Sequence, residues 1–157
     1  MNEFTAKKLG EVLAFAEVSI DTFEKGHDAM ISVLSTDMVE TVVSECQIHI
    51  DAIKKIAEQS GQQSVTLKKS EATILKLRAM RDLYVGEQWD NGTELLEWSG
   101  FFEGAAVVHW ALVRGCAEQT ENSDLIELSL SATNLHHKIL HNAGEILTEV
   151  GKKKSQG

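Results

Sequence analysis

Proline is entirely absent from this chain of 157 residues. Because proline interrupts helices and commonly marks loops and sheet edges, its absence favours long, uninterrupted helices. Long apolar runs are also missing, and no stretch approaches the roughly 18 residues that a membrane-spanning helix needs. The first residues lack the basic, apolar and small-residue regions of a secretory signal peptide. Together these absences predict a helical protein of the cytoplasm without a membrane partner.

Cysteine and positive charge are both scarce. With no secretion signal, Cys46 and Cys116 make a weak case for a disulfide, and we expect both to be small buried residues. The formal net charge is −9, whereas nucleic acids and anionic membranes need a basic face on their partner. Nucleic acid is therefore not an expected partner. The longest basic run, 152–154, suits the negative end of a last helix.

What is present is the composition of an ordinary globular domain, with 43% apolar and 25% charged residues. Apolar residues recur every three or four positions in four segments. This spacing predicts long helices over 3–25, about 35–61, 93–118 and from 123 onward. A shorter helix is expected over 68–84, inside the long connection between the second and third. The expected fold is one all-α domain spanning 1–157, a four-helix bundle with one long crossover.

Two of the predicted helices carry a glutamate midway along their length, and the next long helix carries a histidine. The separation of Glu17 from His49 is almost the same as that of Glu103 from His136. In antiparallel helix pairs, these four positions would lie at similar depth. An ionised glutamate in a core is costly unless it is paired, hydrogen-bonded or bound to metal. The pattern therefore predicts a divalent metal site, and the alternative for each glutamate is contact with water or a lysine.

The order and spacing of Glu17, His49, Glu103 and His136 resemble the ferritin-like superfamily, in its rubrerythrin-like members. That family is a four-helix bundle with one long crossover. Its di-iron site takes a glutamate from each of two helices and a Glu-x-x-His pair from each of the other two. The resemblance covers most of the chain. It implies a ferritin-like domain that binds iron and is redox-active toward oxygen or peroxide, and it leaves the catalytic residues open.

The sequence departs from this family three residues before each histidine. Cys46 and Thr133 occupy the positions where the family has bridging carboxylates. Glu45, one turn before His49, is the candidate replacement, whereas no acidic residue lies close before His136. A single-metal site, or a site that has lost its metal, therefore stands beside the di-metal interpretation. Iron is the favoured metal, with zinc and manganese as alternatives, because carboxylate and imidazole ligands suit all three.

A second resemblance competes with the first. Metal-binding bundles of the DinB-like family use one histidine from the second helix and a His-x-x-x-His pair from the last. His49, His137 and His141 match this pattern, and the last two lie one turn apart on a common face. A helix cannot turn both His136 and His137 toward one core. Only one of the two resemblances can therefore be correct.

The predicted helix over 93–118 is apolar on several of its faces. Its aromatic residues are Trp98, Phe101, Phe102 and Trp110. A helix that is apolar all round is usually buried on all sides. We expect a homodimer packed partly through this helix, and the alternative is a small-molecule pocket beside the aromatic cluster. A metal-free bundle that binds a second copy or a small molecule is the third functional hypothesis.

Overall fold

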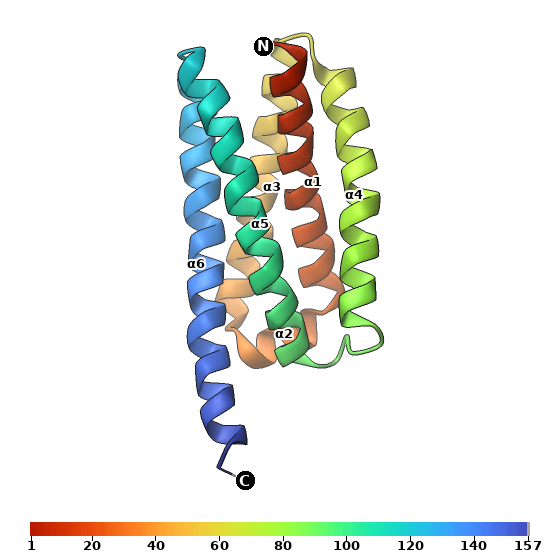
Figure 1. The fold of residues 1–157 in the computed structure, drawn as a ribbon, viewed down its shortest axis with the longest axis vertical. Helices are drawn as coiled ribbons and strands as arrows, with labels where there is room; N and C mark the ends of the chain where they lie inside the picture. Colours follow the sequence, from red (N-terminus) through yellow and green to blue (C-terminus); the bar gives the residue numbers. More distant parts are fainter. Residues whose placement is uncertain (157) are drawn as a thin grey trace.

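A computed structural model describes residues 1–156 of the chain, and these contain six α-helices and no strand. The helices are α1 (Glu3–Lys25), α2 (His27–Val33), α3 (Thr36–Gln59), α4 (Gln63–Val85), α5 (Gly92–Gln119) and α6 (Ser123–Lys154). Figure 1 shows the long helices side by side along one axis, with short α2 crossing at one end. The prediction of an all-helical bundle is confirmed. None of the described helices is both long and apolar enough to cross a membrane.

Side-chain caps fix where four of the helices begin. Asn2, Ser35, Asn91 and Asn122 each accept a hydrogen bond from a backbone N–H in the first turn that follows. The first N–H groups of a helix have no partner inside the helix, and such caps satisfy them. The observed starts therefore lie within a residue or two of those that the apolar spacing predicts.

The crossover between α3 and α5 differs from the sequence-based expectation. It contains α4, which has 23 residues and is as long as α1, rather than a short helix over 68–84. The φ angles of Gly61 and Gly86, at either end of α4, are +68° and +58°. Glycine adopts such positive angles without strain. The helix therefore fills the whole segment between the two glycines, because no proline or further glycine stops it earlier.

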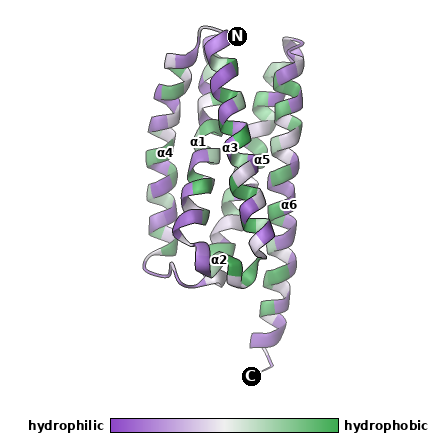
Figure 2. Ribbon diagram, turned by 180° about the vertical axis from the view of Figure 1, so that it is seen from behind, coloured by the Kyte–Doolittle hydropathy of each residue, from purple (hydrophilic) through white to green (hydrophobic). Residues whose placement is uncertain are grey.

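The hydrophobic core draws on every long helix. Buried members of the core include Phe15, Ile53, Leu77, Trp110 and Ile139. α1 packs against α3, α4 and α5, while α6 packs mainly against α5 and also against α3. In Figure 2, the last turns of α6 extend past the other helices and end in a hydrophilic turn. Burial of each large apolar side chain stabilises such a bundle by about 1.5–3 kcal/mol.

A buried carboxylate joins α1 to α4 and α5. The two oxygens of Glu11 lie 3.1 Å from the ammonium groups of Lys8 and Lys69 and 3.1 Å from Nδ1 of His109. Burial alone raises the pKa of Glu11, but the two lysines outweigh it and hold this pKa below its ordinary value of 4.5. The carboxylate is therefore ionised at neutral pH and contributes to the attachment of α4.

A second polar contact attaches the other end of α4. Arg81 is buried and donates to Asp21 at 2.6 Å and to Thr22 at 3.2 Å, both on α1. Arg78 also donates to Asp21, at 3.2 Å. These contacts and the Glu11 group fix the lengthwise position of α4 against α1.

α1 and α4 approach each other most closely at Gly10. A Cβ atom built on Gly10 would lie 2.4 Å from the carbonyl oxygen of Thr66, and the Thr66 hydroxyl donates to the carbonyl of Ala6 at 3.2 Å. We expect Gly10→Ala to lower the free energy of unfolding by about 1–3 kcal/mol in urea denaturation, because backbone must move apart. The control is Gly144→Ala, where an added Cβ meets nothing and stability should be equal or slightly higher. Equal stability of the two variants would contradict the close approach.

The Glu11 group predicts a specific dependence of stability on pH. Its pKa is depressed in the folded state, so its contribution is present above pH 4.5 and is lost as the pH falls below that value. Glu11→Gln should therefore lower stability at pH 7 and flatten the loss of stability below pH 4.5. Exposed Glu58 provides the control, and Glu58→Gln should leave both unchanged. Identical pH profiles for wild type and Glu11→Gln would show that the carboxylate does not hold α4.

Candidate functional site

Glu103 of α5 and His136 of α6 form a buried pair midway along the two helices. Their side chains are 1% and 2% exposed, and Nδ1 of His136 contacts Oε2 of Glu103. Both residues lie on the inner sides of helices that pack along their length. Removing a carboxylate and an imidazole from water is costly, and only a well-formed partner offsets the cost. The pair is therefore a candidate for function as well as a link between α5 and α6.

The second oxygen of the Glu103 carboxylate is a further anomaly. Oε1 is buried, and no described residue forms a hydrogen bond with it. Such an atom normally finds a partner, since leaving it unpaired costs about 1–3 kcal/mol and more when the group is charged. The Ser19 hydroxyl of α1 is also buried, and the thiol of Cys46 is the polar group beside it. The bundle interior thus holds polar atoms that helix packing alone does not satisfy.

α3 contributes Cys46 and His49, which lie about one turn apart and are 0% and 3% exposed. Burial raises the pKa of the Cys46 thiol to about 12, and the negative charge of Glu103 acts in the same direction. Burial also lowers the pKa of His49 to about 4, and neighbouring His136 disfavours its protonation further. At neutral pH, Cys46 is therefore a thiol and His49 a neutral imidazole. We call Cys46, His49, Glu103 and His136 the central cluster.

His49 is held toward α6. Its Nε2 atom lies 3.1 Å from the hydroxyl of Ser131, and its ring meets Trp110 edge-on, with centroids 6.4 Å apart. One imidazole nitrogen is therefore occupied by a hydroxyl that a competing ligand could replace. The Trp110 ring lies beside the buried imidazole, and burial is the larger cause of the lowered pKa of His49.

The structure gathers the predicted site residues only in part. Glu103, His136 and His49 lie in the core. Glu17 does not, because its side chain is 30% exposed and its carboxylate lies 3.2 Å from the ammonium of Lys54. This is the surface alternative that the sequence left open for it, and α1 instead turns Ser19 toward the core.

Glu45 and His137 also lie outside the cluster. Glu45 is only half-buried, because the next residue, Cys46, takes the inward position on α3. His137 is exposed together with His141, since α6 buries His136 and successive helix residues point about 100° apart. His136 is therefore the inward histidine, and the three histidines of the DinB-like pattern are not brought together.

No group of three or more His, Cys, Asp or Glu side chains within residues 1–156 is arranged to hold a metal ion. Sequence reasoning also missed Ser19 and assigned Cys46 only a packing role. Cys46 had a usable signal, because it follows Val39 and Val42 on the buried stripe of α3. Ser19 had none, since a small polar residue within the predicted helix over 3–25 gives no sign of burial.

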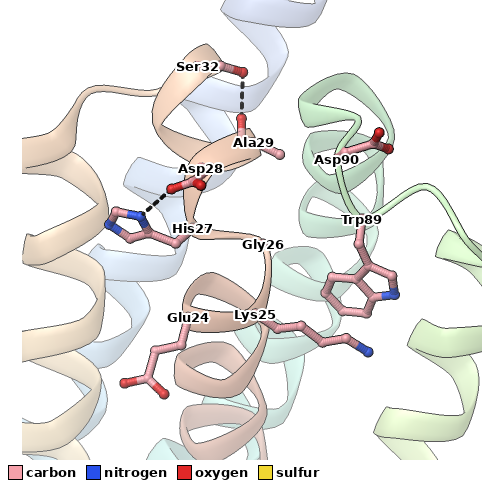
Figure 3. A pocket seen from close by; sticks show the side chains of 9 residues that line it. All are labelled: Glu24, Lys25, Gly26, His27, Asp28, Ala29, Ser32, Trp89 and Asp90. Atoms are coloured by element: carbon pink, nitrogen blue, oxygen red, sulfur yellow. Dashed lines mark hydrogen bonds and ion pairs between the residues drawn. The ribbon is translucent and has the colours of Figure 1, made fainter.

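A surface pocket of about 650 Å³ lies at the end of the bundle, where α1 meets α2 (Figure 3). Trp89 and Asp90, just before α5, complete its lining. The ammonium of Lys25 lies 3.8 Å from the centre of the Trp89 ring, so a cation of the chain itself covers that aromatic face. The pocket shares no residue with the central cluster or with the predicted aromatic cluster on α5.

No family model, curated protein or solved structure matches the chain.

The buried pair predicts a strongly non-additive response to substitution. Glu103→Leu or His136→Leu alone leaves one buried polar group unpaired and should cost about 3–5 kcal/mol of unfolding free energy. The double variant removes both groups and should recover most of that loss. Chemical denaturation in the presence of a chelator measures all three, with Glu17→Leu as a control that should change stability by less than about 1 kcal/mol. Additive effects of the two substitutions would show that the pair is not coupled.

Proposed function

We propose that this chain is a metal-binding helical bundle that holds one divalent transition-metal ion in the central cluster. Glu103, His136 and His49 are the proposed ligands, and Cys46 is the candidate for a fourth. The observation that carries the proposal is the Oε1 atom of Glu103, a buried carboxylate oxygen without a hydrogen-bond partner among the described residues. A cation beside this oxygen would compensate both its charge and its missing bond.

The chemistry of the donors supports this proposal. Carboxylate, imidazole and thiolate groups together suit zinc or iron. Because the pKa of His49 is lowered to about 4, its ring is already neutral at pH 7 and no proton has to be displaced from it. Cys46 would bind only as a thiolate, and its pKa of about 12 means that a nearby cation would have to favour the loss of its proton.

The arrangement of the residues supports one ion rather than two. Glu17 is engaged with Lys54 at the surface, and Glu45 is turned away from the core. No three of these side chains are arranged to hold an ion. Binding therefore requires the His49 imidazole to give up its contact with the Ser131 hydroxyl. A bound iron would supply redox chemistry toward oxygen or peroxide, and a bound zinc would supply Lewis-acid chemistry.

The course of the chain supports a ferritin-like domain over residues 1–157. Figure 1 shows α1 and α3 running in opposite directions, as do α5 and α6, with α4 as the crossover between the two pairs. The central cluster takes its residues from α3, α5 and α6, and Ser19 of α1 faces Cys46. These four helices surround the cluster, while α4 lies against α1. This arrangement is the one expected of a four-helix bundle with one long crossover.

A metal-free bundle that acts through a second copy is the other candidate function. The observation that favours it is an exposed apolar surface on α5, where Phe101 and Val108 are 58% and 63% exposed. Such residues on a helix surface mark interaction sites when they form a continuous patch. Glu103 lies on the inner side of α5 and His136 on α6, so this surface and the metal site can be tested separately.

Metal analysis of protein purified without chelators tests the proposal. We expect about one iron or zinc ion per chain, with at least tenfold weaker retention in Glu103→Gln and His136→Ala. Matched controls are Glu17→Gln and His137→Ala, which should retain the ion, because both residues lie outside the central cluster.

Two outcomes would contradict the metal proposal in different ways. Less than about 0.2 ion per chain, with no uptake of added iron, zinc or manganese, would leave the metal-free bundle as the function. Loss of the ion in His137→Ala, with retention in Glu103→Gln, would instead place the metal on the DinB-like histidines at the surface of α6.

A further inference from the structure

The outer surface of α5 is apolar and open. Phe101, Val108 and Leu112 are 58%, 63% and 43% exposed, although each is large enough to contribute to a core. Between Gly100 and Val113 this surface carries no charged side chain, because Glu103 points inward. α4 covers α1, but α6 and α1 leave this side of α5 without a neighbouring helix (Figure 1).

Large and small residues alternate along this surface. Phe101, Val108 and Gly115 are spaced by seven residues, which places them on one side of the helix. Gly104 lies between the first two, and an added Cβ at Gly104 or Gly115 would meet no atom of the chain within 4 Å. The apolar surface is therefore recessed at the two glycines and protrudes at the large side chains beside them.

A groove of about 330 Å³ continues this surface between the start of α1 and the end of α5. Phe4, Leu112, Gly115 and Cys116 contribute to its lining. Phe4 is itself 53% exposed. The end of the α5 surface is therefore hollow at Gly115, whereas its beginning protrudes at Phe101.

We propose that two copies of this chain pair through α5 in antiparallel orientation, with the two-fold axis near Val108. A two-fold axis at position 108 places residue 101 opposite residue 115, because each is seven positions away from it. Phe101 of each copy then enters the groove beside Gly115 of the other. The same two-fold axis places Leu112 of one copy over Gly104 of the other, and Val108 of one copy against Val108 of the other. The surface is thus complementary to itself, as an isologous interface must be.

The helix dipoles favour the same orientation. Antiparallel pairing places the positive N-terminal end of one α5 beside the negative C-terminal end of the other, whereas parallel pairing would superpose like ends. The described residues that line the groove carry no charged side chain, so Phe101 enters it without removing a charge from water.

The area that a stable dimer must bury also indicates that the interface extends beyond α5. A stable interface buries about 800 Å² on each partner. Tyr84 of α4 is 47% exposed. Its ring centroid lies 5.8 Å from that of Trp98, and the Trp98 ring in turn contacts Phe101. Tyr84 at one end and Phe4 at the other therefore extend the apolar surface beyond the helix itself.

Analytical ultracentrifugation of the full chain tests this interface. Wild type should sediment as a dimer, and Val108→Asp should raise the dissociation constant at least tenfold, because it places two carboxylates at the axis. Leu83→Asp is the control, since Leu83 is 87% exposed on α4 and outside the proposed interface. Circular dichroism should show folded protein in both variants. A monomeric wild type, or equal weakening by both substitutions, would overturn the proposal.

Disulfide cross-linking tests the register. In a Cys116→Ser background, Val108→Cys should form a covalent dimer on mild oxidation, because the two introduced thiols meet at the axis. A mixture of Phe101→Cys and Gly115→Cys chains should cross-link to each other for the same reason. Leu83→Cys in that background should stay uncrosslinked. A dimer that cross-links through Leu83→Cys but not through Val108→Cys would show that another surface mediates pairing. Neither measurement depends on metal content, so failure of the proposed interface can be distinguished from failure of the proposed metal site.

Discussion

The contact between Glu103 and His136 is the constraint on which the interior of this bundle depends. A carboxylate enclosed by helices can remain there only if neighbouring groups accommodate its charge, and His136 satisfies only one of its two oxygens. The charge of Glu103 also helps to keep Cys46 protonated, while His136 helps to keep His49 neutral. A purely apolar core would give the helices comparable stability at lower cost. The retention of these groups is the physical reason for treating the cluster as a functional site.

The two halves of the bundle differ in how far the rest of the chain covers their helices. α4 lies along α1 through Glu11 and Asp21 and buries α1 on nearly every side. The outer surface of α5 carries exposed apolar residues, yet none of the described helices lies over it. A second copy paired at Val108 would provide for α5 the cover that α4 provides for α1. The inner side of α5 would then serve the metal while its outer side serves assembly.

Periodicity in the sequence predicted the helices well because cap residues and glycines mark their ends clearly. It also identified Glu103, His49 and His136, since equal spacing in two helix pairs implies equal depth. It placed Glu17 inward because the separation of Glu17 from His49 almost equals that of Glu103 from His136. In the structure, residues 12–16 of α1 are all buried. Because α4 also covers α1, a wider part of the circumference of α1 is buried. The apolar spacing therefore does not show that Ser19, rather than Glu17, faces the core. The length of α4 was missed for a related reason: its polar sequence shows little periodicity, and tertiary ion pairs hold it in place.

Oε1 of Glu103, the carboxylate oxygen without a hydrogen-bond partner in the described part of the chain, is the atom that we propose binds the metal. Anomalous X-ray diffraction from crystals of the intact protein grown with zinc or iron tests this proposal most directly. We predict a single anomalous peak bonded to Oε1 of Glu103, at roughly 2.0–2.2 Å for zinc, with His136 and His49 as neighbouring ligands. A peak confined to surface histidines His137 and His141, or a buried water in place of the ion, would contradict it.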